Sequence, residues 1–126
     1  MELLQELCES RGLGVLLVTH DLGLVARRAQ HLVVMHQGHV CESGASKCLL
    51  EDPRHPYTRG LLASQLPTDR YRGDLDRMQG ILGDPHSWEL QNSLEGPVRP
   101  WWPSEKAQAT ALPRLVEISP NHFIAV

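Results

Sequence analysis

The chain has 126 residues, and its 12 Lys and Arg residues against 15 Asp and Glu residues give a formal net charge of −3 with the histidines neutral. This length corresponds to one domain or part of one, and the charge balance argues against a nucleic-acid-binding surface. The longest apolar run, Leu13–Val18, is too short for a transmembrane helix, and the acidic N-terminus does not resemble a secretory signal. Three cysteines without regular spacing argue against a disulfide framework.

The first half of the chain, residues 1–66, is expected to form α/β structure. Its first apolar residues recur at helical spacing and predict an amphipathic helix that ends at Gly12. The stretch Leu13–Thr19, a continuous apolar run that ends in a polar residue, is typical of a strand buried on both faces of a parallel sheet. The next segment, Asp21–Ala29, is predicted to be helical, because an aspartate comes first and two arginines come near the end.

A hairpin and two short helices are expected to complete this half. His31–His36 and His39–Ser43 predict two strands joined by a turn at Gly38. A short helix is expected over Ala45–Leu50. A second helix is expected to begin at a proline and to cover Pro56–Gln65.

The second half, residues 67–126, is expected to be an irregular extension, because it holds seven of the nine prolines and few long periodic segments. Tyr71–Leu82 is predicted to be a linker or a marginal helix. Pro97–Pro103 is excluded from a regular helix or a central strand. The last stretch, Leu115–Val126, is expected to add a short strand.

His20 is the most informative single residue. It follows the expected strand directly and precedes the expected helix, which is where open α/β sheets bind ligands. The alternative is a structural histidine that caps the strand.

Two stretches of sequence resemble a known family. Thr-His-Asp-Leu at residues 19–22 is followed by a predicted helix and then by Val-Met-His-Gln-Gly-His-Val-Cys-Glu-Ser-Gly at residues 34–44. This arrangement resembles the last third of an ABC-transporter ATP-binding subunit. Asp-Pro-Arg-His-Pro-Tyr-Thr-Arg-Gly-Leu-Leu at residues 52–62 closely resembles a stretch found in ATPases of dipeptide and oligopeptide importers, whose relatives carry nickel.

The resemblance implies a fold and a role for His20. Residues 1–66 are expected to be the C-terminal part of a nucleotide-binding domain, a partial P-loop NTPase (RecA-like) core with mostly parallel strands and a hairpin. Residues 67–126 are expected to be the irregular C-terminal extension of peptide importers. In the family, the histidine at the position of His20 is the switch (H-loop) residue, which reaches the γ-phosphate and the attacking water. Asp21 is expected to cap the following helix rather than to act as a base.

Several motifs of a complete ATPase are absent from the sequence. It has no Gly-x-x-x-x-Gly-Lys-[Ser/Thr] loop, no Leu-Ser-Gly-Gly-Gln-like signature and no apolar strand that ends in Asp-Glu. The chain is therefore expected to be the C-terminal third of an ATPase subunit and to be inactive alone. ATP and Mg²⁺ are expected to bind only in the complete subunit.

The extension departs from the family pattern. In the family it often carries four cysteines that can hold an iron–sulfur cluster, whereas no cysteine follows Cys48 here, so no cluster is expected. Trp101 and Trp102 stand in this part of the sequence, and three roles are open for them: core residues, a patch that faces a partner, or part of a disordered remnant.

The resemblance also implies partners and a location. The complete subunit is expected to work with a second ABC ATPase subunit and two membrane permeases. It is expected to lie on the cytoplasmic face of the inner (plasma) membrane, peripheral to the membrane and not inserted, without nucleic acid. The solute, whether a dipeptide, an oligopeptide or nickel, is not specified by this sequence.

A different class of function is also possible on residue types alone. His36 and His39 face each other across the predicted turn, and Cys41 points to the same side. Two imidazoles and a thiolate can bind zinc or nickel, so a small metal-binding protein is one alternative. The other is a non-catalytic binding module that recognises a peptide or partner through its Pro/Trp tail. Against the metal site, His36, His39 and Cys41 are more readily explained as ordinary half-buried strand residues, because no fourth ligand is evident.

Overall fold

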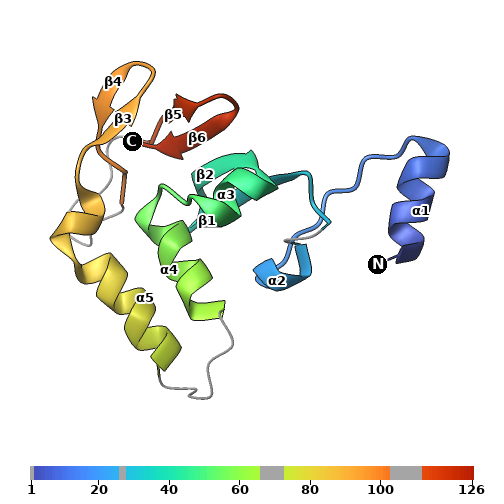
Figure 1. Cartoon of the computed structure of the whole chain (residues 1–126), viewed down its shortest axis with the longest axis horizontal. Coiled ribbons are helices and arrows are strands. Elements are labelled where there is room, and N and C mark those ends of the chain that lie inside the picture. The colour runs from blue at the N-terminus through green and yellow to red at the C-terminus, as the bar shows by residue number, and fades with distance from the viewer. Residues whose placement is uncertain (1, 26–27, 66–72, 103–111) are drawn as a thin grey trace.

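The computed structural model describes residues 2–25, 28–65, 73–102 and 112–126. The helices in chain order are α1 (Glu2–Arg11), α2 (Leu22–Val25), α3 (Ser46–Glu51), α4 (Pro56–Gln65), α5 (Gly73–Gly83) and the 3-10 helix η1 (Pro85–Trp88). The strands are β1 (His31–His36), β2 (His39–Ala45), β3 (Gln91–Ser93), β4 (Gly96–Val98), β5 (Leu115–Ser119) and β6 (His122–Ala125). In Figure 1, α1 lies apart from the other elements, at the end of an extended segment. None of the helices in the described ranges is long and apolar enough to cross a membrane.

Strands from both ends of the sequence share one sheet. Four strands lie in the order β1-β2-β6-β5, and every neighbouring pair is antiparallel. The predicted hairpin is confirmed by β1 and β2. Its turn consists of Gln37 and Gly38, both with positive φ (48° and 81°), as the right-handed twist of a tight hairpin requires. β6 pairs with the other side of β2, so the hairpin's second strand is central.

The expectation of mostly parallel strands is wrong for the described part of the chain. Leu13–Thr19 is extended but forms no strand there, and it is exposed, with Leu16 91% and Val18 89% accessible to solvent. A strand buried on both faces needs a neighbouring strand and covering layers on both sides of the sheet. Among the described elements, no strand pairs with Leu13–Thr19, and its side chains are exposed.

The helix predictions are largely confirmed. α1, α3 and α4 occupy the predicted segments, and Gly12 follows α1 with a φ of 62°, in the left-handed region that ends helices. In the helix expected over Asp21–Ala29, the described helical residues are Leu22–Val25 (α2), and residues 28–29 are not helical. Ala26 and Arg27 lie outside the described residues. Of the two alternatives for Tyr71–Leu82, the helix is confirmed from Gly73 onward as α5, and residues 71–72 lie outside the described residues.

The core lies under the hairpin. Leu32 and Val34 alternate along β1 toward the buried face, while Val33 and Met35 point to the exposed face. Leu32 and Val34 pack with Leu49 of α3 and with Val25 of α2. α3 contacts both strands of the hairpin, and α4 contacts β2 and α2. The alternation of apolar residues in β1 thus matches a strand covered on one face only.

The second half of the chain is more regular than expected. α5 packs along α4 (Figure 1), and the two helices approach closely where a Cβ on Gly60 would lie 3.1 Å from the side chain of Met78. Leu115–Val126 supplies two strands rather than one. Pro97 lies in β4, which pairs only with β3 in the described structure, as a proline on an edge strand can. Pairing of β6 with β2 is long-range, so the local sequence does not reveal it.

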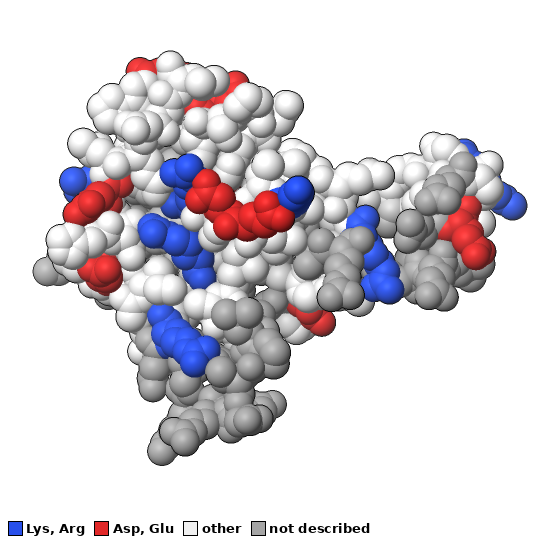
Figure 2. All heavy atoms as spheres, in the orientation of Figure 1, with Lys and Arg blue, Asp and Glu red and all other residues white. Residues whose placement is uncertain are grey.

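Charged side chains of both signs lie side by side on the surface, as Figure 2 shows for one face. Two exposed ion pairs are examples: Arg54 with Asp52 at 2.8 Å and Arg114 with Glu95 at 2.9 Å. Exposed pairs of this kind contribute little to stability.

Candidate functional site

His20, the residue predicted to act on the γ-phosphate, lies between the extended segment Leu13–Thr19 and α2, and it is exposed. Beside it, Asp21 Oδ1 accepts a hydrogen bond from Leu24 N–H at 3.0 Å, and Asp21 N–H donates to Thr19 Oγ1 at 3.0 Å. The prediction that Asp21 caps the following helix is therefore confirmed. The role of His20 in phosphate chemistry stays a prediction.

The structure does not assemble the metal site considered for His36, His39 and Cys41. The His36 ring stacks on Trp102, with centroids 4.7 Å apart, and the His39 ring meets Trp101 edge-on at 5.1 Å. Burial raises the pKa of the Cys41 thiol to about 11, so without a bound cation this side chain is a neutral thiol at neutral pH. The described residues contain no group of three or more His, Cys, Asp or Glu that could hold a metal ion. His36, His39 and Cys41 are therefore not placed together as a ligand set in the described structure.

An aromatic cluster forms instead around the end of the hairpin. It consists of His36, Tyr57, Trp88 and Trp102, each half-buried. Ring centroids lie 4.5 Å apart for His36 and Tyr57, 5.7 Å for Tyr57 and Trp102, and 5.3 Å for Trp88 and Trp102. Burial lowers the pKa of His36 and raises the pKa of Tyr57. Of the alternatives for the adjacent tryptophans, the structure has them packed against the hairpin and α4.

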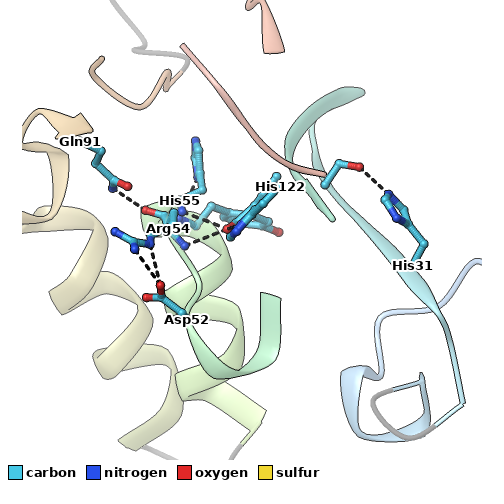
Figure 3. Close-up of polar contacts among 9 residues, drawn as sticks. His31, Asp52, Arg54, His55, Gln91 and His122 are labelled. Carbon is cyan, nitrogen blue, oxygen red and sulfur yellow. Dashed lines mark hydrogen bonds and ion pairs between the residues drawn. The ribbon is translucent and has the colours of Figure 1, made fainter. Parts of the chain in front are cut away.

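A buried polar network lies at the centre of the sheet (Figure 3). Glu42, on the central strand β2, is fully buried. Its Oε1 accepts hydrogen bonds from Arg54 N–H at 2.8 Å and from His122 Nε2 at 2.6 Å, and its Oε2 accepts one from His55 N–H at 3.1 Å. One carboxylate therefore joins the hairpin, the start of α4 and the C-terminal strand β6.

His55 caps α4 with its ring. Its Nδ1 accepts a hydrogen bond from Tyr57 N–H at 3.1 Å, while its carbonyl accepts the first helical bond, from Arg59 N–H, at 3.1 Å. Pro56 takes the first helical position, where a missing N–H costs nothing. Since Nδ1 is an acceptor, Nε2 carries the proton and donates to the Trp101 carbonyl at 2.9 Å. Burial lowers the pKa of His55, which agrees with a neutral ring. The His-Pro-Tyr segment is thus a helix start.

Two further contacts attach later segments to the start of α4. Arg59 Nη2 donates to the Ser87 carbonyl at 2.7 Å, and Gln91 Nε2 donates to the Arg54 carbonyl at 2.6 Å. These bonds hold η1 and β3 against α4. The Glu42 carboxylate and both ring nitrogens of His55 are satisfied within the protein, whereas Arg59 Nε and Gln91 Oε1 are buried without a hydrogen-bond partner in the described structure. The bonds of this network therefore position segments relative to one another.

No local sequence pattern marks Glu42, His55 and His122 as a group. One feature of the sequence does point to a buried network: Glu42 stands in the middle of the predicted strand His39–Ser43. A carboxylate buried in a sheet needs hydrogen-bond partners that are also buried. The residues that bind Glu42 lie 12, 13 and 80 positions away from it in the sequence. No local sequence pattern specifies such pairings.

Comparison with known proteins identifies relatives along almost the whole chain. The chain is 35% identical to the oligopeptide transport ATP-binding protein OppD of Lactococcus lactis over 124 residues, which is 98% of this chain and 36% of that protein. It is 39% identical over 82 residues to the dipeptide transport ATP-binding protein DppD of Haemophilus influenzae (65% of this chain, 25% of that protein). It is 40% identical over 83 residues to the oligopeptide transport ATP-binding protein AppD of Bacillus subtilis (66% of this chain, 24% of that protein).

The chain is a relative of the ATP-binding subunits of peptide ABC transporters. It spans about a third of the length of the Lactococcus relative, and less of the other two. No protein-family model matches it, and no solved structure matches it. The resemblance stated from the two sequence stretches is confirmed by these relatives.

Proposed function

We propose that the chain is the C-terminal part of the ATP-binding subunit of an ABC importer for dipeptides or oligopeptides. The observation that carries this proposal is similarity over 98% of the chain to a protein nearly three times as long, the oligopeptide transport ATP-binding protein of Lactococcus lactis. The names of the relatives favour peptides over nickel as the solute. Residues 1–66 then come from the nucleotide-binding domain and residues 67–126 form the C-terminal extension.

Within the complete subunit, His20 is the residue of this chain that takes part in ATP hydrolysis. Phosphoryl transfer to water is accelerated mainly by positioning and by stabilising charge. A neutral imidazole suits this task, because one ring nitrogen donates to a phosphate oxygen while the other accepts from water. The hydrogen bond from Leu24 N–H to Asp21 Oδ1 fixes the backbone next to His20. The Cα of His20, from which the imidazole extends, therefore has a defined position relative to α2.

The described residues do not assemble a magnesium site of their own. No group of three or more His, Cys, Asp or Glu in the described ranges is placed to hold a metal, and the sequence lacks the phosphate-binding loop and its Lys. In the proposed subunit, ATP and Mg²⁺ are therefore held by parts that this chain does not supply. For the same reason the chain alone is expected to be inactive.

The exposed apolar segment Leu13–Val18 supports a larger assembly. Leu16 and Val18 are 91% and 89% accessible, and covering a side chain of this size contributes about 1.5–3 kcal/mol. The remaining two thirds of such a subunit is a natural cover for this segment. The complete subunit would pair with a second ATPase subunit and with membrane permeases, peripheral to the membrane on its cytoplasmic side.

A chimera tests this function. The 124-residue matching segment of the Lactococcus lactis protein is replaced by the corresponding residues of this chain, and Mg²⁺-dependent ATP hydrolysis is measured. We expect hydrolysis by the chimera and none by the isolated 126-residue chain. Hydrolysis by the isolated chain, or a folded chimera that binds ATP but does not hydrolyse it, would contradict the proposal.

A further inference from the structure

His55 stands where four segments meet. Its side chain has no accessible surface. It begins α4, its backbone N–H binds Glu42 of β2, its ring donates to the Trp101 carbonyl, and its ring meets Trp88 of η1 edge-on at 5.8 Å. Any change in the charge of this ring therefore acts on all four segments together.

Both ring nitrogens of His55 are in use, in opposite senses. Nδ1 accepts from Tyr57 N–H, and Nε2 donates to the Trp101 carbonyl. A protonated ring has two N–H donors and no acceptor. Protonation therefore sets Nδ1–H against Tyr57 N–H, two donors 3.1 Å apart by their heavy atoms, and removes the cap of α4.

The charged groups around the ring do not relieve this conflict. Arg59 of α4 and His36 of β1 both disfavour a positive charge on His55, whereas Glu42 of β2 favours it. The Glu42 carboxylate is itself occupied by two backbone N–H groups and by His122 of β6. Burial is the largest influence and lowers the pKa of His55, so the folded arrangement holds the neutral ring.

The segment held by the ring is the one that carries the adjacent tryptophans. Trp101 is bound through its carbonyl to His55 and through its N–H to the Ala125 carbonyl at 2.8 Å. Trp102 stacks on His36, with 13° between the ring planes. If the charged His55 ring turns out toward water, it leaves the Trp101 carbonyl and the Trp88 edge.

We propose that His55 is a pH-sensitive latch, whose protonation uncaps α4 and loosens the attachment of the Trp101–Trp102 segment to that helix. The latch joins α4, in the first half of the chain, to the Trp101–Trp102 segment in the second half. It needs neither ATP nor His20, so it goes beyond the proposed function and is tested separately from it.

Tryptophan fluorescence reports on the latch directly. All three tryptophans of the chain, at positions 88, 101 and 102, lie beside His55 or in the aromatic cluster. We expect the emission of the full 126-residue chain to change reversibly as pH falls from 8 to 5. The midpoint should lie below 6.5, the ordinary pKa of histidine, because burial lowers the pKa of His55.

Three variants assign the change to a residue. In His55→Asn the side-chain carbonyl can still cap α4 but does not titrate, so the change in emission should be lost. His31→Asn is the matched control, because His31 is exposed and bonds only Ser43 Oγ among the contacts described, and the change should remain. Retention of the change in His55→Asn, or its loss in His36→Asn alone, would overturn the proposal.

A measurement on the unmodified chain covers the case in which His55→Asn does not fold. NMR titration of the imidazole resonances gives the protonation midpoint of each histidine. The His55 midpoint should coincide with the fluorescence midpoint. A His55 ring that protonates without any change in tryptophan emission, or emission that follows another histidine, would refute the latch.

Discussion

Removing the Glu42 carboxylate should destabilise the fold more than any exposed charge does. Glu42 has no accessible surface and accepts three hydrogen bonds, from Arg54 N–H, His55 N–H and His122 Nε2. Glu42→Ala leaves these donors without an acceptor and leaves a gap in the central strand.

The size of the effect follows from the burial of the donors. His55 N–H and His122 Nε2 are fully enclosed, and each buried donor left unsatisfied costs about 1–3 kcal/mol. Arg54 N–H is only partly buried, so water replaces part of its bond. Glu42→Ala should therefore lower the free energy of unfolding by about 3–5 kcal/mol, a large part of the ~5–15 kcal/mol typical of a domain. Glu42→Gln keeps one carbonyl acceptor and should lose about half as much.

Urea unfolding followed by tryptophan fluorescence measures these differences. Glu95→Ala is the matched control, because Glu95 makes an exposed ion pair with Arg114 and such pairs contribute about 0–1 kcal/mol. The order of stability should be wild type and Glu95→Ala first, then Glu42→Gln, then Glu42→Ala. A Glu42→Ala variant within 1 kcal/mol of wild type would refute the account of this network.

Three further outcomes are expected. Gly44→Ala should lower the free energy of unfolding by about 1–3 kcal/mol through overpacking, because an added Cβ would lie 2.8 Å from Leu49 Cδ1 and 3.0 Å from the Asn121 carbonyl oxygen. An unchanged urea midpoint would contradict this prediction. The control is Gly80→Ala, because an added Cβ there has nothing within 4 Å. Cys41 should resist a thiol-specific reagent at pH 7.5 in the folded chain, since burial raises its pKa to about 11, while the exposed Cys48 should react. Peptide mapping distinguishes the two labelled sites, and equal labelling of both cysteines would contradict the prediction. The chain should also lose stability as pH falls below about 6.5. The reason is that the pKa of His55 is lowered in the folded chain, so the unfolded chain binds more protons in this pH range. Urea midpoints at pH 7.5 and pH 5.5 measure the difference, and a higher midpoint at pH 5.5 would contradict the prediction.

Local patterns predict the local elements well. The spacing of apolar residues predicts α1, Gly38 predicts the hairpin turn, and Pro56 predicts the start of α4. These elements can be predicted because each depends on the conformational preferences of a few adjacent residues. α2 is shorter than its charge pattern suggests. Its cap at Asp21 is as predicted, but the cap fixes only where a helix begins.

The wrong and missing parts depend on distant neighbours. Leu13–Thr19 has the composition of a buried strand, yet a strand forms only beside another strand, and the described residues place none there. Pairing of β6 with β2 joins segments about 80 residues apart, as in the bond of His122 to Glu42. The buried network follows from that pairing, so sequence analysis could predict the candidate catalytic His20 but not the residues that hold the two halves together.

The most direct test of the proposed function is the effect of His20 on ATP turnover in the chimera with the Lactococcus lactis protein. His20→Ala should lower turnover about 10²-fold, as removal of a positioned catalytic side chain does. ATP affinity should change little, because the phosphate-binding loop lies outside this chain. His31→Ala, whose exposed ring bonds Ser43 Oγ, is the matched control and should leave turnover within about threefold. Turnover per folded molecule that is unchanged in His20→Ala, with the loss appearing only in stability, would contradict the assignment.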